Sequence, residues 1–187
     1  MIRKMSKKFI EYISDKNYSK EEKEEMEYIL NTMIFETLKI VLTFIIFMLL
    51  GYQWQCLIIL ILMSITKPYI GGYHENSQLK CFAATVLLTA GIIFMSMHTR
   101  FTFYSNCVAI LFCVFCIYNQ IPVLNPNMPI TRPHLIKKNR KKGLCNIIII
   151  GIISIVLYNY SGFYCIITWV LIVQTLLLFN KNEYKER

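Results

Sequence analysis

The sequence predicts an all-α membrane protein with about six transmembrane helices, both termini in the cytoplasm and an amphipathic helix at the N-terminal end. Apolar residues make up 56% of its 187 residues, which exceeds the roughly 45–50% typical of a soluble domain. Three segments, residues 40–66, 101–119 and 144–173, contain no Asp, Glu, Lys or Arg. A transmembrane helix needs about 20 mostly apolar residues. A soluble domain of this length could not bury all three segments, so a polytopic helical membrane protein is expected.

Residues 1–32 are expected to form a cytoplasmic helical region that precedes a transmembrane domain over residues 33–187. The first residues are basic, but charged residues follow them instead of the apolar segment and cleavage site of a signal peptide. Apolar residues recur at helical spacing among the basic ones, which is typical of a helix lying on a membrane surface; a solvated leader helix is the alternative. Ser19 and Glu22 have the spacing of a capping box, so a helix is expected to begin there.

The apolar segment after residue 33 could form one span or two. Its uncharged part, residues 40–66, would reach about 40 Å as a helix, which is more than one hydrocarbon core and less than two. The two-span interpretation places helices at residues 34–50 and 54–70, joined by a tight turn around Gly51. Length alone does not decide between the two interpretations.

The distribution of basic residues favours two spans. Further spans are expected at about residues 81–97, 101–121, 144–160 and 163–179. With six spans and the N-terminus inside, Arg100 is the one basic residue placed outside. Lys39 lies within the first span, where it can form an ion pair with Glu36 that reaches the interface. A five-span chain would put the basic segment 131–143 outside, although Lys and Arg collect on the cytoplasmic side of membrane proteins.

The net charge of +9 could indicate nucleic acid, but in so apolar a chain it indicates the cytoplasmic face and contact with anionic lipid. The seven cysteines lie mostly within apolar segments, unlike the disulfide framework of a secreted domain. Cys113 and Cys116 have redox or zinc spacing without a His or acidic partner nearby, so packing is expected. The sequence calls for no cofactor and no metal.

His74 and Cys81 are the candidate catalytic residues, in an inner loop expected over residues 67–81. A cysteine needs a nearby base to become a thiolate nucleophile, and histidine titrates near neutral pH. Seven residues along one helix would leave the two side chains about 10 Å apart, too far for proton transfer. The loop must therefore fold back, and Gly71 and Gly72 provide the backbone freedom for that turn.

Two lysines near this pair, Lys67 and Lys80, add positive potential that favours a thiolate. A loop histidine beside a packing cysteine is the alternative interpretation. Polar residues inside the other spans are expected to form hydrogen bonds between helices. These residues are Asn106, Asn119, Gln120, Asn146 and Gln174.

The segment KPYIGGYHENSQLKC, residues 67–81, resembles the His-and-Cys motif of the AgrB family, the accessory gene regulator B membrane peptidases of Gram-positive quorum sensing. A second segment, IPVLNPNMPI at residues 121–130, resembles that family's Pro-Val-x-x-Pro-Asn-x-Pro segment before its basic loop. Lys67 and Glu75 depart from the Arg and Ala expected at those positions. With the length and six-span layout, the resemblance covers nearly the whole chain.

The resemblance implies a cysteine endopeptidase of the cell membrane, with its active site on the cytoplasmic face. Such an enzyme cleaves the C-terminal part from an AgrD-like autoinducer propeptide and promotes closure of the remainder to a thiolactone or lactone. By matching position, Cys81 would be the nucleophile that forms an acyl-enzyme thioester, and His74 the general base. A homodimer is one assembly that the sequence leaves open.

A basic inner loop is expected over residues 131–143, on the same face as Cys81. Its cluster of positive charges consists of Lys137, Lys138, Arg140, Lys141 and Lys142. These charges could fix topology and bind anionic lipid, or they could also capture the acidic tail of a propeptide as rim charges.

Two other classes of protein are left open by the sequence. In a small polytopic transporter, Glu36 and Lys39 would be pathway residues. A scaffold subunit without peptidase activity would keep its function after the loss of Cys81.

Overall fold

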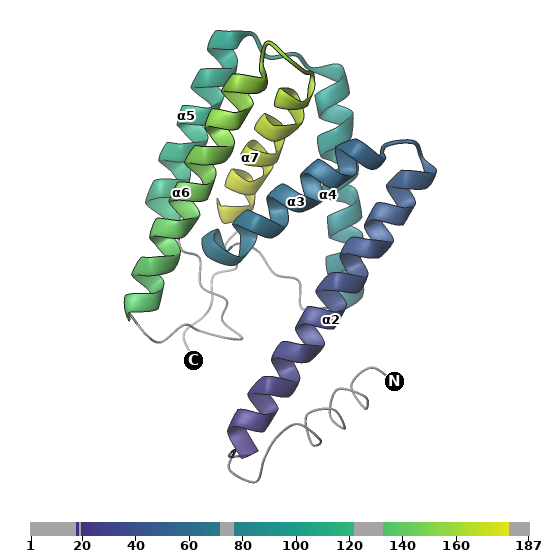
Figure 1. Cartoon of the computed structure of the whole chain (residues 1–187), viewed down its shortest axis with the longest axis vertical. Coiled ribbons are helices and arrows are strands. Elements are labelled where there is room, and N and C mark those ends of the chain that lie inside the picture. The colour runs from purple at the N-terminus through teal and green to yellow at the C-terminus, as the bar shows by residue number, and fades with distance from the viewer. Residues whose placement is uncertain (1–17, 19, 72–76, 122–132, 180–187) are drawn as a thin grey trace.

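A computed structural model describes residues 18, 20–71, 77–121 and 133–179, which form six helices (Figure 1). The helices are α2 (Lys20–Leu49), α3 (Gln53–Ile70), α4 (Gln78–His98), α5 (Phe103–Gln120), α6 (Pro133–Leu157) and α7 (Phe163–Phe179). The all-helical fold class is therefore confirmed. The start of α2 agrees with the expected capping sequence, while the surface helix expected near the N-terminus lies outside the described residues.

Four of the described helices, α2 to α5, are long and apolar enough to cross a membrane. α7 is an apolar helix of 17 residues, and α6 begins with basic residues before it becomes apolar at Leu144. The apolar parts of all six helices coincide with the six expected spans. The chain is thus a helical membrane protein with several membrane-spanning helices.

A sharp turn at Gly51 separates α2 from α3, as the two-span interpretation predicts. Gly51 has a φ of 81°, a conformation that glycine adopts without the steric cost of a Cβ atom. The Tyr52 N–H donates to the Phe47 carbonyl at 2.8 Å, and the Gly51 N–H donates to the Met48 carbonyl at 3.1 Å. These bonds satisfy carbonyls at the end of α2 and reverse the chain.

The two inner loops are shorter than expected, because helices extend into both of them. α3 ends at Ile70, as the two-span interpretation predicts, and α4 begins at Gln78, slightly before the expected span at residue 81, so residues 71–77 connect them. α6 begins at Pro133, and the expected basic loop is helical from there onwards. Proline is favoured at the first position of a helix, and Lys and Arg are good helix formers, which explains this correction.

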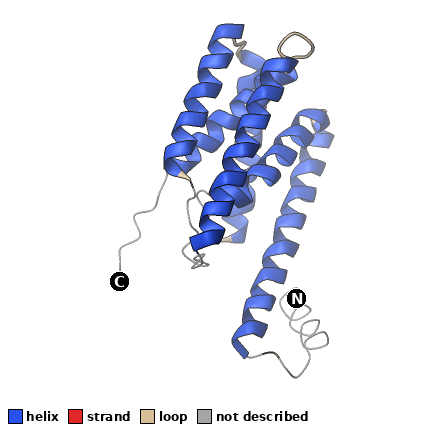
Figure 2. Cartoon of the chain, turned by 60° about the vertical axis from the view of Figure 1, so that its left-hand side comes forward, coloured by secondary structure: helices blue, strands red, loops and turns tan. Residues whose placement is uncertain are grey.

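α7 lies at the centre of the helical bundle and packs against α3, α4, α5 and α6. Its Leu171 belongs to a buried cluster with Ile117 of α5 and Ile147 of α6. The preceding residue, Val170, belongs to a second cluster with Ile59 of α3. Both views show α2 extending past the rest of the bundle at its N-terminal end (Figures 1 and 2).

Buried polar side chains connect several helices, as expected. Asn106 Oδ1 accepts from the Thr168 hydroxyl at 2.6 Å, and Gln174 Nε2 donates to the Thr66 hydroxyl at 2.5 Å. Asn146 Nδ2 donates to the Ile65 carbonyl at 3.2 Å. The expectation is wrong for Asn119, whose exposed side chain donates to the Phe115 carbonyl of its own helix at 2.8 Å. For Gln120 it stays a prediction.

Candidate functional site

Cys81 lies at the start of α4, where its half-buried side chain faces the bundle. Ser77 precedes the helix in an extended conformation, and its carbonyl accepts a hydrogen bond from the Cys81 N–H at 2.9 Å. The Cys81 thiol is free. The N-terminus of a helix carries partial positive charge, which favours a thiolate over a thiol.

Lys39 of α2 approaches Cys81 from the neighbouring helix. Its Nζ atom lies 3.6 Å from Cys81 Sγ and 2.5 Å from Glu36 Oε2. The expected ion pair between Glu36 and Lys39 is therefore confirmed. The Lys39 side chain is only 10% exposed, against 46% for Glu36. Cys81 and Glu36 provide polar partners for its ammonium group. That the ion pair reaches the membrane interface stays a prediction.

Lys67, in the last turn of α3, is a second lysine in the neighbourhood of Lys39, Cys81 and Glu36. Lys80, the other lysine expected to influence Cys81, is exposed at the start of α4. Three helices thus place two amines and one carboxylate around the Cys81 thiol, and we call Glu36, Lys39, Lys67 and Cys81 the thiol cluster.

The chain leaves α3 through Gly71, which has a φ of 75° and a ψ of −148°. Its N–H donates to the Lys67 carbonyl at 3.0 Å. A side chain is strained in this conformation and glycine is not, so Gly71 fits the turn expected of it. Gly72 and His74 lie outside the described residues, and the role of His74 as the base stays a prediction.

The five basic residues expected to bind substrate lie on the first turns of α6 and fall into two groups. Arg140 lies over the Tyr118 ring at 5.2 Å, and its Nη2 atom donates to the Tyr118 carbonyl at 3.1 Å. Lys142 Nζ lies over the Tyr69 ring at 5.5 Å. These two side chains hold α6 against α5 and α3. The second group consists of Lys137, Lys138 and Lys141, and all five side chains are exposed.

α6 passes very close to the end of α3, where the chain turns towards the candidate site. A Cβ atom placed on Gly143 would lie 3.0 Å from Ile70 Cγ2 and 3.3 Å from Tyr69 Cβ. The basic turns of α6 therefore end directly beside the end of α3 from which Gly71 leads into the connection to α4.

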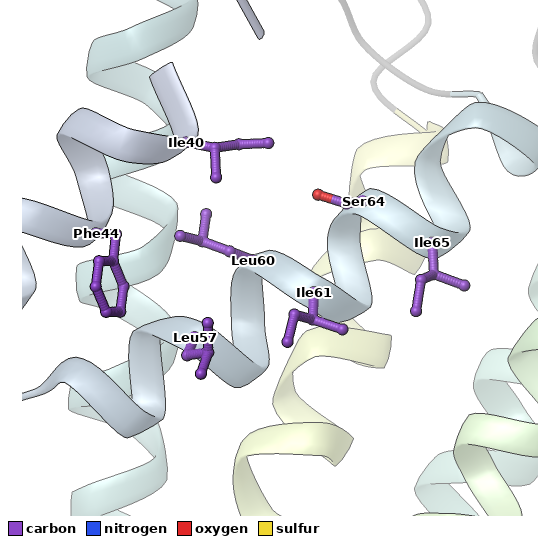
Figure 3. A pocket seen from close by; sticks show the side chains of 7 residues that line it. All are labelled: Ile40, Phe44, Leu57, Leu60, Ile61, Ser64 and Ile65. Atoms are coloured by element: carbon purple, nitrogen blue, oxygen red, sulfur yellow. The ribbon is translucent and has the colours of Figure 1, made fainter. Parts of the chain in front are cut away.

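An apolar groove of about 330 Å³ lies between α2 and α3 (Figure 3). Its lining consists of Ile40, Phe44, Leu57, Leu60, Ile61, Ser64 and Ile65. None of these side chains titrates, so the groove has no means of acid–base or nucleophilic catalysis by itself.

The other cysteines do not form a comparable site. Cys113 and Cys116 are free thiols, 2% and 8% exposed, within the packed part of α5. Among the residues that the structure describes, no three His, Cys, Asp or Glu side chains are grouped so that they could hold a metal ion.

Sequence reasoning missed the contact between Lys39 and Cys81. The two residues are 42 positions apart, so no local spacing connects them. A signal was present, because an ionisable residue in an otherwise apolar transmembrane helix is by default a functional-site candidate. Lys39 was expected to pair with Glu36 or, in a transporter, to lie on a transport pathway, but not to contact Cys81.

The helices and the thiol cluster define a polytopic helical membrane protein in which a free cysteine is surrounded by charged side chains. The AgrB family model, accessory gene regulator B, matches residues 6–178. The chain therefore belongs to the AgrB family of membrane peptidases that process quorum-sensing propeptides, and the resemblance seen in its two motifs is confirmed.

Two relatives from Clostridium perfringens are similar along most of their length. An AgrB-like protein of strain 13 / Type A is 40% identical over 186 residues, which is 99% of this chain and 100% of the relative. An AgrB-like protein of strain SM101 / Type A is 32% identical over 174 residues, which is 87% of this chain and 81% of the relative. No solved structure matches the chain.

Proposed function

We propose that this protein is a membrane cysteine endopeptidase that cleaves an AgrD-like propeptide, with Cys81 as nucleophile and His74 as general base. The observation that carries the proposal is the position of Cys81, the one cysteine whose sulfur lies 3.6 Å from a largely buried ammonium group among the described residues. Membership of the AgrB family supplies the class of substrate. The site would lie on the cytoplasmic face of the cell membrane.

The first half-reaction transfers the propeptide to the enzyme. His74 accepts the proton of the Cys81 thiol, and the thiolate attacks the scissile carbonyl carbon to form a C–S bond. The tetrahedral intermediate then collapses with cleavage of the C–N bond. The departing amine takes the proton from His74, which leaves the N-terminal part of the propeptide as a thioester on Cys81.

The second half-reaction closes the ring. A Cys or Ser side chain of the propeptide attacks the thioester carbonyl and loses its proton, and Cys81 departs and recovers one. Attack by a thiol exchanges one thioester for another, so little bond energy changes. Water must be kept from the thioester during this step. Cys81 is half-buried on α4, next to Lys39 of α2, and this position favours the exclusion of water.

The exposed lysines of α6 are suited to bring the substrate to this site. Lys137, Lys138 and Lys141 would attract the acidic C-terminal part expected of such a propeptide, as rim charges that raise the rate of association. Anionic lipid headgroups would compete for the same charges.

The test is a cleavage assay with the protein in lipid vesicles and an AgrD-like propeptide. Cys81→Ala and His74→Ala should each reduce cleavage by at least about 100-fold, with normal amounts of inserted protein. Cys145→Ser is the matched control and should stay within a few-fold of wild type, because Cys145 is exposed on α6. Cleavage by Cys81→Ala would refute the peptidase assignment and favour a scaffold.

A further inference from the structure

The contact between Lys39 and Cys81 gives Lys39 a role in the reaction. We propose that Lys39 is a positioning residue whose ammonium group donates to the Cys81 sulfur and stabilises it as a thiolate, while Glu36 holds Lys39 in place. This inference rests on the proposed function, because it takes Cys81 as the nucleophile. It adds a residue that the resemblance in the two motifs did not include.

A purely structural ion pair would not require the observed geometry. Glu36 is nearly half exposed, so a lysine three residues away could meet it at the helix surface. The Lys39 side chain is instead 10% exposed, and its Nζ atom reaches the sulfur of a different helix. Pairing with Glu36 alone therefore does not explain why the Lys39 side chain points towards Cys81.

The charges of the thiol cluster favour an anionic sulfur. The Lys39 ammonium group lies 3.6 Å from Cys81 Sγ, and Glu36, which offsets its charge, is nearly half exposed to solvent. A largely buried positive charge is stabilised by a close anion, so this geometry favours a Cys81 thiolate beside Lys39. Among the residues that the structure describes, Lys80 is exposed and α7, which also packs against α4, has no charged side chain.

The same ammonium group would act in both half-reactions. In the first, it stabilises the thiolate before attack on the propeptide. In the second, the ring-forming group displaces Cys81, and the sulfur again becomes negative as the thioester breaks. Lys39 therefore stabilises the attacking sulfur and later the departing one, without forming a bond to the substrate.

The test measures alkylation of Cys81 by iodoacetamide as a function of pH, with the full chain in lipid vesicles and the other six cysteines changed to serine. Lys39→Met should slow alkylation at neutral pH by about tenfold. At high pH, where the thiol ionises in either protein, its rate should approach that of wild type. If Lys39 had only a structural role, its substitution would leave the dependence of the alkylation rate on pH unchanged.

Conservative and control variants make the comparison specific. Lys39→Arg keeps the charge and should recover most of the alkylation rate at neutral pH. Arg100→Met removes one positive charge beyond the opposite end of α4 and should leave the profile unchanged. In the cleavage assay, Lys39→Met should lower kcat by at least about tenfold and change KM by less than about twofold, because Lys39 is not placed against the substrate.

A second variant covers the case in which Lys39→Met destabilises the protein by leaving Glu36 unpaired. Glu36→Gln with Lys39→Met removes both charges and should show the same slow alkylation at neutral pH. A wild-type alkylation profile in either well-inserted variant would overturn the role of Lys39. Alkylation needs no propeptide, so a failure of the peptidase proposal, shown by cleavage in Cys81→Ala, is distinguished from a failure of this inference.

Discussion

Lys39 carries its charge within a helix of the membrane domain, and its neighbours explain how the fold accommodates it. Glu36 is 2.5 Å away and Cys81 is 3.6 Å away, so the ammonium group has partners on two helices. Charged side chains inside a membrane protein are costly and are retained where they pair or act. Here the pairing with Glu36 is observed, and the position of the charge beside the candidate nucleophile supports the role proposed for Lys39.

A single glycine sets how closely α5 and α6 approach each other. A Cβ atom on Gly151 would lie 2.7 Å from Ile110 Cγ2, and Ile110 is 5% exposed. Gly151→Ala should therefore lower the melting temperature of the protein in detergent, because the overpacked isoleucine must move.

Gly91→Ala is the matched control for that substitution, since nothing lies within 4 Å of a Cβ atom at this position of α4. It should leave the melting temperature unchanged or raise it, because alanine is favoured over glycine in a helix by about 1 kcal/mol. Equal effects of the two substitutions would contradict the close approach of α5 and α6 at Gly151.

α6 combines two roles along one helix. Its apolar part, which begins near Leu144, packs in the bundle, and its first turns present basic residues beside the end of α3. All five basic side chains are exposed, but Arg140 and Lys142 lie over tyrosine rings of α5 and α3. Lys137, Lys138 and Lys141 are therefore the first candidates for binding substrate.

Changing Lys137, Lys138 and Lys141 to Gln should raise the KM for the propeptide several-fold and remove much of its dependence on salt, because rim charges act mainly on association. Turnover at saturation should stay near wild type, since the thiol cluster is untouched. The control, Arg140→Gln with Lys142→Gln, should mainly reduce thermal stability. An unchanged KM in the triple variant would leave these lysines as topology and lipid-binding residues.

The bounds of the apolar segments were predictable from sequence because charged residues, glycine and proline interrupt them. The turn at Gly51 and the helices on either side of it are one example. The contact between Lys39 and Cys81 was not predictable, because it depends on how α2 and α4 are rotated against each other. The helical start at Pro133 was missed because a cluster of lysines is equally compatible with a loop and with an exposed helix.

The helices alternate in direction, so each end of the bundle is expected to face one side of the membrane. Labelling from one side can identify which end that is. The thiol cluster and the basic turns of α6 lie at the end where α3 finishes and α4 and α6 begin, while Gln53 lies near the opposite end. The end of α3 and the starts of α4 and α6 lie towards the same end of the bundle (Figure 1). With this topology, substrate capture and cleavage are expected on one face of the membrane.

Single cysteines placed at Gln53, Ser77, Asn139 and Tyr184, in a chain without its native cysteines, should separate on treatment of intact cells with an impermeant thiol reagent. Gln53 should be labelled from outside, and the other three only after the membrane is opened. Labelling of Ser77 from outside would exclude six spans with a cytoplasmic site.

The central claim is that the propeptide becomes covalently attached to Cys81, and mass spectrometry of the protein tests it most directly. A propeptide whose ring-forming Cys or Ser is replaced by Ala can be cleaved but cannot cyclise, so the acyl-enzyme should accumulate. We expect the protein to gain the mass of the N-terminal fragment, at Cys81, and to lose it on treatment with hydroxylamine. Cleavage of this propeptide without an adduct on Cys81, or with one on another residue, would contradict the account.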